Sequence, residues 1–563
     1  MSATSLPVTA ASTPDSRHEQ QTRSTSRALV ISALALLLLA GFGLRAYRLG
    51  AEALSEDELN KVRAVAEYRE RGLTPANGEH PFLMKAMLAV SIVAAERWNS
   101  SASPDLHVST ETAARLPGAL LGALTSLLIF LVTREMFGTE VGLVAAGLWA
   151  LDPAAVGFNR IAKEDGFVVF FFLLGNVFWL RGREVAEAGA RKPEPYYWAA
   201  AASFGAMLAS KYVPNYFAIP AAYYYVFQGV RATRWRLGKR KWLVFFAVMG
   251  AAFVVCNPTI LLPGTWQEMR TFAGERRIGH DAYEFMGHLY RNQVSLWLRG
   301  SPWYFYYVFM GVKLPPLTLV GFVVGLPLLF RKRLGDRRYF LLFWFFFWFF
   351  PFTFLGGKFT RYFTFALPAV LIAAALGVSW GAHALGRLVA RYGETAHAYA
   401  RSAVVLLVLS SAAYASVSAA PHYRLYTNAL GGGRERAGSY FPHDEFYDSG
   451  TRDAAKSVAR LARPGALVAS ETPELLAYYA EQAGRTDLRT VSLSDREALR
   501  GLAEGDVIVV ARGRRYFSND AVTRRLAADF QPATVVHLGE IPSERVYVLD
   551  AAALGAVAEA LGR

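Results

Sequence analysis

Residues 28–44 read ALVISALALLLLAGFGL, and the acidic run SEDE, Ser55-Glu56-Asp57-Glu58, follows shortly after them. A helix that crosses the hydrocarbon core of a bilayer needs roughly 20 apolar residues, somewhat fewer if its ends snorkel. The apolar stretch therefore predicts a first membrane span. The carboxylates of Glu56, Asp57 and Glu58 can act only on substrates that reach their side of the membrane. The orientation of the first span therefore determines which substrates are available to them.

The rest of the chain repeats this apolar character in long blocks. Of its 563 residues, 53% are hydrophobic, 14% are aromatic and only 19% are charged, which is unusual for a soluble domain. We therefore predict a polytopic membrane protein of mainly α structure. The expected crossings are 28–46, 113–133, 140–158, 166–180, 196–210, 214–229, 242–262, 313–330, 339–355, 362–381 and 402–419.

The basic residues mark one side of this predicted bundle. The net charge is +15, and much of it falls in the short loops 181–192, 231–241 and 331–338. The positive-inside rule places these loops in the cytoplasm, together with a Ser/Thr-rich tail, 1–27, that we expect to be disordered. A nucleic-acid partner is disfavoured, because no basic stripe with interleaved aromatic residues lies elsewhere. The segments left for the outer side are 47–112, 159–165, 211–213, 263–312, 356–361 and the tail from 420.

Two of the outer segments are long enough to have structure of their own. In the first outer loop, 47–112, the runs 59–70 and 81–97 are typical of helices that lie along a membrane surface. Residues 421–449 include Gly431-Gly432-Gly433 and predict a flexible linker. Residues 450–563 then predict a small α/β domain outside the membrane, with strands at 466–470, 506–511, 533–538 and 545–549.

Asp57 and Glu58 are the leading candidates for catalysis. A carboxylate that faces a hydroxyl group can accept its proton or orient it for attack. The alternative is structural, because an acidic residue at this position can cap the helix that is expected to begin near Leu59. One of the two residues can cap the helix while the other is catalytic.

Several other charged side chains fall at the outer ends of predicted spans. Charged groups at membrane depth are costly and usually face an internal cavity, so this distribution indicates a site. Lys211, Lys358 and Arg361 are suited to binding a phosphate, or alternatively an anionic lipid headgroup. For the remaining candidates a purely structural role is the alternative: a helix start, a solvated loop or close helix packing. These candidates are His80, Lys85, Arg115, Arg160 and Asp165.

A metal site is less clearly indicated. His280, Asp281, Glu284 and His288 lie on one outer loop at nearly helical spacing, and this pattern fits either a divalent cation or a solvated helix face. The single cysteine, Cys256, excludes a disulfide within the chain and a Cys-based metal site. No cofactor is required by the sequence.

The order of these motifs resembles the protein O-mannosyltransferase family and, more broadly, the GT-C glycosyltransferases that use a phospholipid carrier, which include the aminoarabinose transferases. The resemblance covers roughly residues 28 to 440. It rests on Asp57-Glu58, His80-Pro81-Phe82 with Lys85, Arg115-Leu116-Pro117, Arg160 with Asp165, Pro302-Trp303-Tyr304-Phe305-Tyr306, Lys313-Leu314-Pro315-Pro316, and Lys358 with Arg361-Tyr362.

This resemblance implies a GT-C bundle in a bacterial-type cytoplasmic membrane. It also implies a reaction in which a sugar passes, with inversion, from a polyprenyl-phosphate donor to a protein hydroxyl, lipid or glycan acceptor at the outer face. Asp57 would be the base or the acceptor-orienting acid, with Glu58 assisting. Some relatives require a divalent cation. The residues that the resemblance assigns to the donor phosphate are Arg115, Lys211, Lys358 and Arg361.

The sequence also departs from these families. Phe82 stands where the mannosyltransferases usually have a second proline, and the chain ends in an α/β pattern rather than carrying a β-trefoil. A transporter or lipid flippase remains the alternative. Such proteins often have internally repeated halves and sites near the midplane, whereas this chain has no visible repeat and its ionisable groups gather at one end. A membrane-anchored binding module is a third hypothesis.

Overall fold

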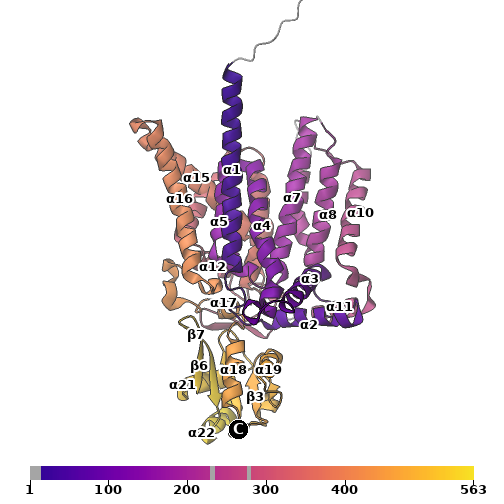
Figure 1. Cartoon of the computed structure of the whole chain (residues 1–563), viewed down its shortest axis with the longest axis vertical. Helices are drawn as coiled ribbons and strands as arrows, with labels where there is room; N and C mark the ends of the chain where they lie inside the picture. Colours follow the sequence, from indigo (N-terminus) through magenta and orange to yellow (C-terminus); the bar gives the residue numbers. More distant parts are fainter. Residues whose placement is uncertain (1–13, 190, 228–234, 275–279, 563) are drawn as a thin grey trace, which may run out of the picture.

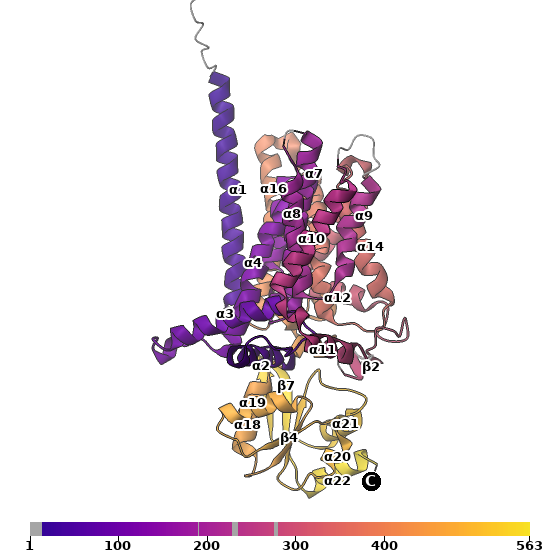
Figure 2. The ribbon, with the colours of Figure 1, turned by 90° about the vertical axis from the view of Figure 1, so that its right-hand side faces the viewer.

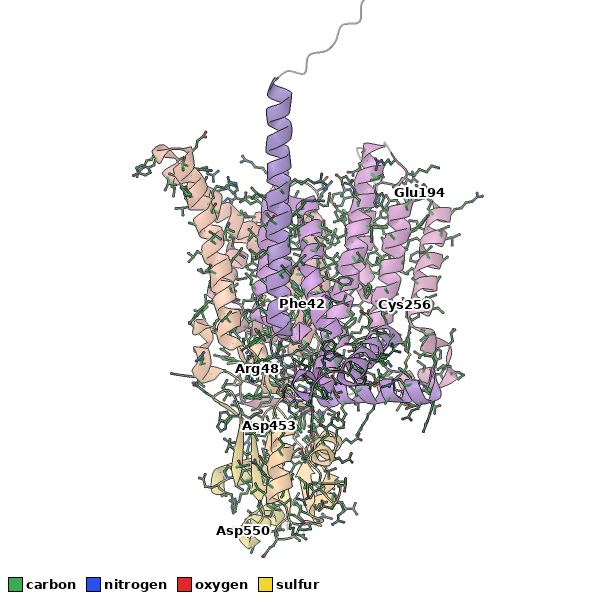
Figure 3. All side chains as sticks on the ribbon, in the orientation of Figure 1. Phe42, Arg48, Glu194, Cys256, Asp453 and Asp550 are labelled. Carbon is green, nitrogen blue, oxygen red and sulfur yellow. The ribbon has the colours of Figure 1, made fainter. Side chains whose placement is uncertain are left out.

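The computed structural model describes residues 14–189, 191–227, 235–274 and 280–562. The molecule has three layers along its long axis (Figure 1). A bundle of helices forms the first layer, short helices lying across its lower end form the second, and a small α/β part forms the third. Figure 3 shows Glu194 near the far end of the bundle, whereas Arg48 lies near the junction with the third layer.

Most predicted spans correspond to one helix or to a helix with a short extension, the span predicted at 140–158 is divided between two helices, and residues 228–229 of the span predicted at 214–229 lie outside the described part. Five described helices are long and apolar enough to cross a membrane, and a bent pair makes a sixth, so the chain is a multi-pass membrane protein. The figure of eleven crossings stays a prediction, because the other bundle helices are shorter or less apolar. The bundle consists of α1 (Pro14–Ala46), α4 (Thr110–Phe137), α5 (Thr139–Leu151), α6 (Pro153–Asn159), α7 (Glu164–Ala188), α8 (Glu194–Ser210), α9 (Ala218–Phe227), α10 (Lys239–Cys256), α13 (Pro316–Leu328), α14 (Arg338–Phe354), α15 (Leu367–Val389) and α16 (Glu394–Ala419).

Small residues let some of these helices approach backbone to backbone. A Cβ atom at Gly325 of α13 would lie 1.8 Å from the carbonyl oxygen of Ala373 in α15, and one at Gly377 would lie 2.0 Å from that of Gly321. Contacts of this kind drive helix association in lipid, where burial of apolar surface contributes little.

Two predictions at the ends of this layer need correction. Helix α1 begins at Pro14, so residues 14–27 are helical rather than disordered, while residues 1–13 lie outside the described part. The predicted span 140–158 is divided into α5 and α6, which meet at 60°. The bend falls where Asp152 caps the NH group of Ala155 (3.0 Å) and Pro153 occupies the first position of α6.

The second layer contains the two helices predicted in the first outer loop. Helices α2 (Glu56–Arg71), α3 (Phe82–Asn99) and α11 (Pro263–Gly274) lie across the end of the bundle (Figure 2). Helix α12 (Phe305–Lys313) leads from this layer back into the bundle. Residues 421–449, for which we expected a flexible linker, are well packed here. Asn428 is buried, and its amide donates to the carbonyl oxygens of Gly311 and Leu314, both at 2.7 Å.

Helix α2 is attached to the bundle by a buried ion pair. Glu58 closes a capping box with Ser55, and its two oxygens accept from the Nε and Nη2 of Arg115 in α4, both at 2.8 Å. The NH groups of Ala162 and Ser55 also donate to this carboxylate at 2.8 Å. These bonds fix the start of α2 against α4 and against the turn before α7.

The third layer is a five-stranded sheet with the order β4-β3-β5-β7-β6. Strands β3, β4 and β5 are parallel, and β7 is antiparallel to both β5 and β6. One face of the sheet packs on α18 (Thr451–Leu461) and α19 (Pro473–Gln482), and the other packs on α21 (Asp520–Asp529) and α22 (Ala551–Ala560). The strands are β3 (Leu467–Ser470), β4 (Arg489–Val491), β5 (Val507–Ala511), β6 (Thr534–Leu538) and β7 (Ile541–Val548). Four of them match the predicted strands, and β4 was not predicted.

The near-helical spacing of the 280–288 residues was misleading. This segment forms a hairpin of β1 (Ala282–Phe285) and β2 (His288–Arg291), so its polar side chains do not share a helix face. Instead His280, Asp281 and Glu284 contact the third layer, whereas His288 is exposed. Asp281 accepts from the NH groups of Phe517 and Ser518, both at 3.1 Å, and Glu284 pairs with Arg515 at 3.0 Å.

We predict that Glu58→Ala destabilises the fold by about 3–5 kcal/mol, because it leaves the guanidinium of Arg115 buried without its charge partner. Thermal unfolding of the protein in detergent would measure the loss. Glu70→Ala is the matched control, since Glu70 is exposed on the same helix. Equal unfolding temperatures for the two variants would contradict the prediction.

Candidate functional site

Asp57 lies at the centre of a cluster of polar side chains where the bundle meets the second layer. Its Oδ2 is 2.6 Å from the Nζ of Lys163, which lies in the turn between α6 and α7. The same oxygen accepts the hydroxyl of Tyr447 at 2.5 Å. The Asp57 side chain is 36% exposed, so a ligand can still reach it.

The surrounding charges keep Asp57 ionised. Burial acts to raise the pKa of this carboxyl, but the positive charges of Lys163, Lys61 and Arg361 hold the pKa well below its ordinary value. Burial also lowers the pKa of Lys163 to about 8, against the opposing effect of Asp57. A carboxylate with so low a pKa is a weak base, and it is better suited to orienting a hydroxyl than to removing its proton early.

The residue that donates to Asp57 has an unusual backbone conformation. Tyr447 (φ 45°) and Asp448 (φ 62°) are consecutive residues with backbone angles in the left-handed region, which residues other than glycine rarely adopt. Asp448 is fixed there, since its Oδ2 accepts the NH group of Glu56 (3.1 Å) and its Oδ1 accepts Nε of Arg514 (2.6 Å). Strain of this kind is maintained where the surrounding structure requires one precise orientation.

Arg361 approaches the same centre from the turn before α15. Its Nη1 donates to Oδ1 of Asp444 at 3.2 Å, and its guanidinium carbon lies 5.7 Å from the ring centroid of Tyr447. Asp444 is itself held by the NH group of Thr360 (2.7 Å) and the hydroxyl of Tyr283 (2.6 Å). Within the described residues, the guanidinium of Arg361 makes no other hydrogen bond, so donors remain for an anion.

A second group of charges lies beside Asp57. Lys211 pairs with Asp165 at 2.6 Å, and its Nζ is 5.0 Å from the centroid of the Tyr362 ring. Glu164 lies 3.1 Å from Lys61 and 3.6 Å from Nδ1 of His80. Burial lowers the pKa of His80 to about 3, so this histidine is neutral at physiological pH. The structure thus brings together Asp57, His80, Asp165, Lys211, Arg361 and Tyr362 from the predicted site residues.

The surroundings of Glu58 and Arg115 argue against the roles predicted for them. The two oxygens of Glu58 are occupied by the four donors described above, which favours a structural role over assistance to Asp57. Arg115 is buried and also donates to the carbonyl oxygens of Glu52 (2.9 Å), Leu49 (3.3 Å) and Ala53 (2.5 Å). This geometry argues against a phosphate ligand at Arg115, because no part of the guanidinium faces a free space.

Three further bases are each occupied by backbone carbonyl oxygens. Lys358 donates to those of Ser301 (2.8 Å), Pro302 (3.1 Å) and Thr353 (3.3 Å), which argues against its predicted role at a phosphate. Arg160 and Lys85 are used in the same way. Their acceptors are the carbonyl oxygens of Arg45, Tyr47 and Arg48 for Arg160, and of Ala76, Asn77 and His80 for Lys85.

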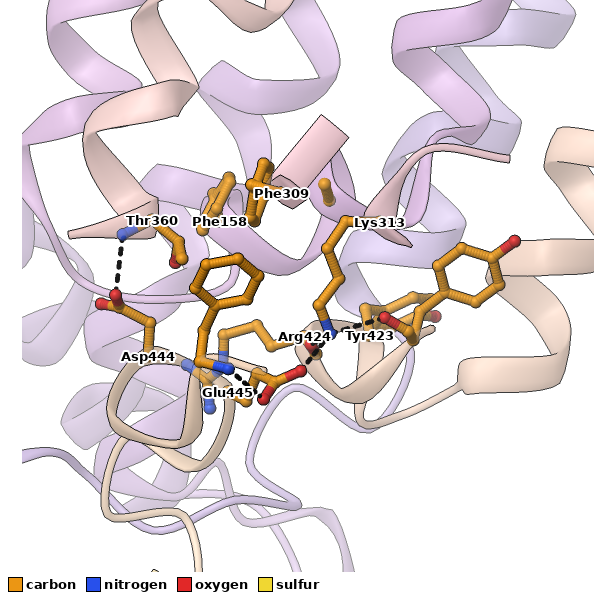
Figure 4. Close-up of a pocket in the computed structure, with 11 residues that line it drawn as sticks. Phe158, Phe309, Lys313, Thr360, Tyr423, Arg424, Asp444 and Glu445 are labelled. Atoms are coloured by element: carbon orange, nitrogen blue, oxygen red, sulfur yellow. Dashed lines mark hydrogen bonds and ion pairs between the residues drawn. The ribbon is translucent and has the colours of Figure 1, made fainter. Parts of the chain in front are cut away.

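A small cavity of about 20 Å³ adjoins Thr360 and Asp444, the hydrogen-bond partner of Arg361 (Figure 4). Phe158, Phe309 and Phe441 supply much of its apolar lining, and Asp444 lies at one side. Lys313 is buried at another side, where it pairs with Glu445 and donates to the carbonyl oxygen of Tyr426 at 2.7 Å. An apolar cavity therefore lies directly beside the charged cluster.

Sequence analysis missed the contribution of residues 442–448, Pro-His-Asp-Glu-Phe-Tyr-Asp. They include α17 (Pro442–Phe446) and supply Asp444, Tyr447 and Asp448 to the site. The density of acidic and aromatic residues in this run was a usable signal, but the preceding glycines suggested a linker. Lys163 lies in the predicted outer segment 159–165 but was not among the candidate site residues.

Metal ligands do not gather in the described ranges. No group of three or more His, Cys, Asp or Glu side chains there is placed to hold a metal ion. Of the residues considered for a metal, His280 stacks on Tyr516 with ring centroids 4.1 Å apart, and Asp281 and Glu284 have the partners given above.

Comparison with known proteins defines the fold. Residues 96–262 match the family model of dolichyl-phosphate-mannose-protein mannosyltransferase, and no curated protein matches the sequence. ArnT from Cupriavidus metallidurans in the apo state has a TM-score of 0.51 and 15% identity, covering 96% of this chain and 100% of that one. AglB, the oligosaccharyltransferase of Archaeoglobus fulgidus, in complex with an inhibitory peptide and a dolichol-phosphate, has a TM-score of 0.51 and 12% identity, covering 86% and 70%. The chain therefore has the fold of the GT-C glycosyltransferases.

Proposed function

We propose that this protein transfers a sugar, with inversion, from a polyprenyl-phosphate donor to an acceptor at the outer face of a bacterial-type cytoplasmic membrane. The observation that carries the proposal is the accessible Asp57 carboxylate, which already accepts one hydroxyl, beside the unsatisfied donors of Arg361. The dolichol-phosphate bound by AglB supports a lipid-linked donor, and its peptide supports a protein as one class of acceptor. A lipid or a glycan hydroxyl is the other class of acceptor that we propose.

Asp57 would hold the acceptor. The hydroxyl of Tyr447 occupies the position that an acceptor hydroxyl would take on Oδ2. As the acceptor oxygen forms its bond to the anomeric carbon, the bond from that carbon to the phosphate oxygen breaks. The hydroxyl proton then passes to the carboxylate of Asp57, whose basicity matters only late in this step.

Arg361 and Lys211 would stabilise the leaving phosphate. Negative charge develops on that group in the transition state, and preorganised positive groups lower its energy most effectively. The planar guanidinium of Arg361 can bind two phosphate oxygens, while Lys211 acts as a point charge. Asp165 and Tyr362 keep Lys211 in place, and His80 lies beside Glu164 at the edge of the site.

The location of the cluster favours transfer over a transporter or flippase. These polar groups lie where the bundle meets the second layer, whereas transporters usually bind their substrate near the middle of the bilayer. We infer that this end of the bundle and the α/β part are extracytoplasmic, in agreement with the basic loops at the other end.

We predict that Asp57→Asn lowers transfer by about 10²- to 10⁴-fold, because the amide cannot take up the acceptor proton. The assay follows a radiolabelled sugar from polyprenyl phosphate into glycoconjugates of membranes that contain the variant. Asp105→Asn, an exposed change in the same outer loop, is the control. Full activity of Asp57→Asn in a correctly folded protein would refute the assignment.

We predict that transfer declines as the pH rises above about 8. Lys163 has a pKa of about 8, so its ammonium is charged below this pH and loses its proton above it, which removes the charge partner of Asp57. Lys163→Arg keeps the charge and should move the alkaline limb of the pH–rate profile upward by at least about one unit. Lys456→Arg, on the exposed face of α18, should leave the profile unchanged. An unaltered limb in Lys163→Arg would assign the titration to another group.

A further inference from the structure

A second cavity lies between the third layer and the β1–β2 hairpin. It has a volume of about 370 Å³, which is large enough for a small molecule. Its walls come from the end of β5, the start of β7, α21 and the turn after β1. Five arginines line it, against two acidic residues, Glu284 and Glu544; the arginines are Arg512, Arg514, Arg515, Arg524 and Arg545.

Two of these arginines are already neutralised. Arg514 is paired with Asp448, and Arg515 pairs with Glu284 (3.0 Å) and with Asp520 (2.5 Å). They form the base of the cavity and do not provide free charge.

The other three arginines retain positive charge for a ligand. Arg524 shares Asp520 with Arg515, at 3.0 Å. Arg512 donates to the carbonyl oxygen of Gly438 at 2.8 Å and has no carboxylate partner in the described part of the chain. Arg545 makes no side-chain hydrogen bond or ion pair with any residue that the structure describes. Positive charge in the cavity therefore exceeds what its acidic residues can neutralise.

Glu544 does not offset this excess at neutral pH. It is buried, its Oε1 accepts the hydroxyl of Thr451 at 3.0 Å, and its Oε2 has no hydrogen-bond partner among the described residues. Burial raises the pKa of Glu544 to about 8, so this side chain is mainly protonated at pH 7. A protonated carboxyl can donate a hydrogen bond to an anion instead of repelling it.

The topology of the sheet agrees with a binding site at this edge. In open α/β sheets, ligands bind outside the carboxyl ends of the parallel strands, near the point where the strand order reverses. Strand β5 lies next to such a point, because the chain passes from β3 outward to β4 and then back across β3 to β5. Residues 510–515, at the carboxyl end of β5, supply much of the cavity wall.

We propose that this cavity binds a phosphate-bearing ligand through Arg512, Arg524 and Arg545. Guanidinium groups bind phosphate oxygens in pairs, and three of them suit a dianion better than a single carboxylate. Arg514 at the base of the cavity pairs with Asp448 of the Asp57 site, but Arg512, Arg524 and Arg545 have no described hydrogen bond to that site, so the proposal stands independently of glycosyl transfer. The phosphate can belong to a soluble molecule or to a lipid headgroup.

Titration of the full-length protein in neutral detergent with inorganic phosphate tests this site. Thermal unfolding is followed at constant ionic strength, with chloride as the balancing anion. We expect a saturable rise in the unfolding temperature, with an apparent affinity at least about tenfold weaker in Arg545→Gln, the cost of one lost charge-assisted contact. Arg525→Gln is the matched control, because Arg525 neighbours Arg524 but pairs with Asp529 (3.0 Å) and Glu559 (3.1 Å).

A response that does not saturate, or one that is equal in Arg545→Gln and Arg525→Gln, would overturn the proposal. Arg524→Gln provides a second test if Arg545→Gln fails to fold. Nanodiscs of phosphatidylglycerol and of phosphatidylcholine then distinguish the source of the phosphate. Competition by phosphatidylglycerol alone identifies a lipid headgroup, and the absence of competition identifies a soluble ligand. Asp57→Asn should bind phosphate at the cavity unchanged, which separates this test from that of the transfer reaction.

Discussion

The ion pair between Glu58 and Arg115 is the contact on which the arrangement of the site depends. Taking both charges out of water is costly, and their mutual attraction offsets that cost only when the remaining hydrogen-bonding groups are also satisfied. Here the carboxylate receives four donors, and the guanidinium is surrounded by carbonyl oxygens of the first outer loop. The start of α2 is thereby fixed with little freedom to move.

This constraint separates two neighbouring carboxylates into different roles. Glu58 points into the contact with α4, and Asp57, one residue earlier on the helix, is left beside Lys163 and Tyr447. A helix turns by about 100° per residue, so two adjacent acids cannot both face the same partner. The structural interpretation of the acidic run therefore holds for Glu58, whereas the chemical one stays a proposal for Asp57.

The elements of the fold follow closely from the sequence, because the thickness of a bilayer sets how long an apolar helix must be. The availability of each base does not. Lys358 and Arg361 are three residues apart and look alike in sequence, yet Lys358 is surrounded by carbonyl oxygens while Arg361 keeps free donors. That difference depends on which distant segments place their backbone carbonyl oxygens beside each base, and no local sequence pattern predicts this placement. Residues 442–448 were misjudged for the same reason, since their packing partners lie far away in the chain.

The core of the α/β part has an implication for how the protein can be divided. Ala53, Leu54 and Leu59, from the first outer loop, belong to the same apolar cluster as Val458 of α18 and Leu475 of α19. A chain cut after residue 449 would expose this apolar surface on the piece that keeps the bundle, and the released piece would lack part of its interior. The C-terminal region therefore shares its interior with the first outer loop, and we expect separation at this point to destabilise both pieces.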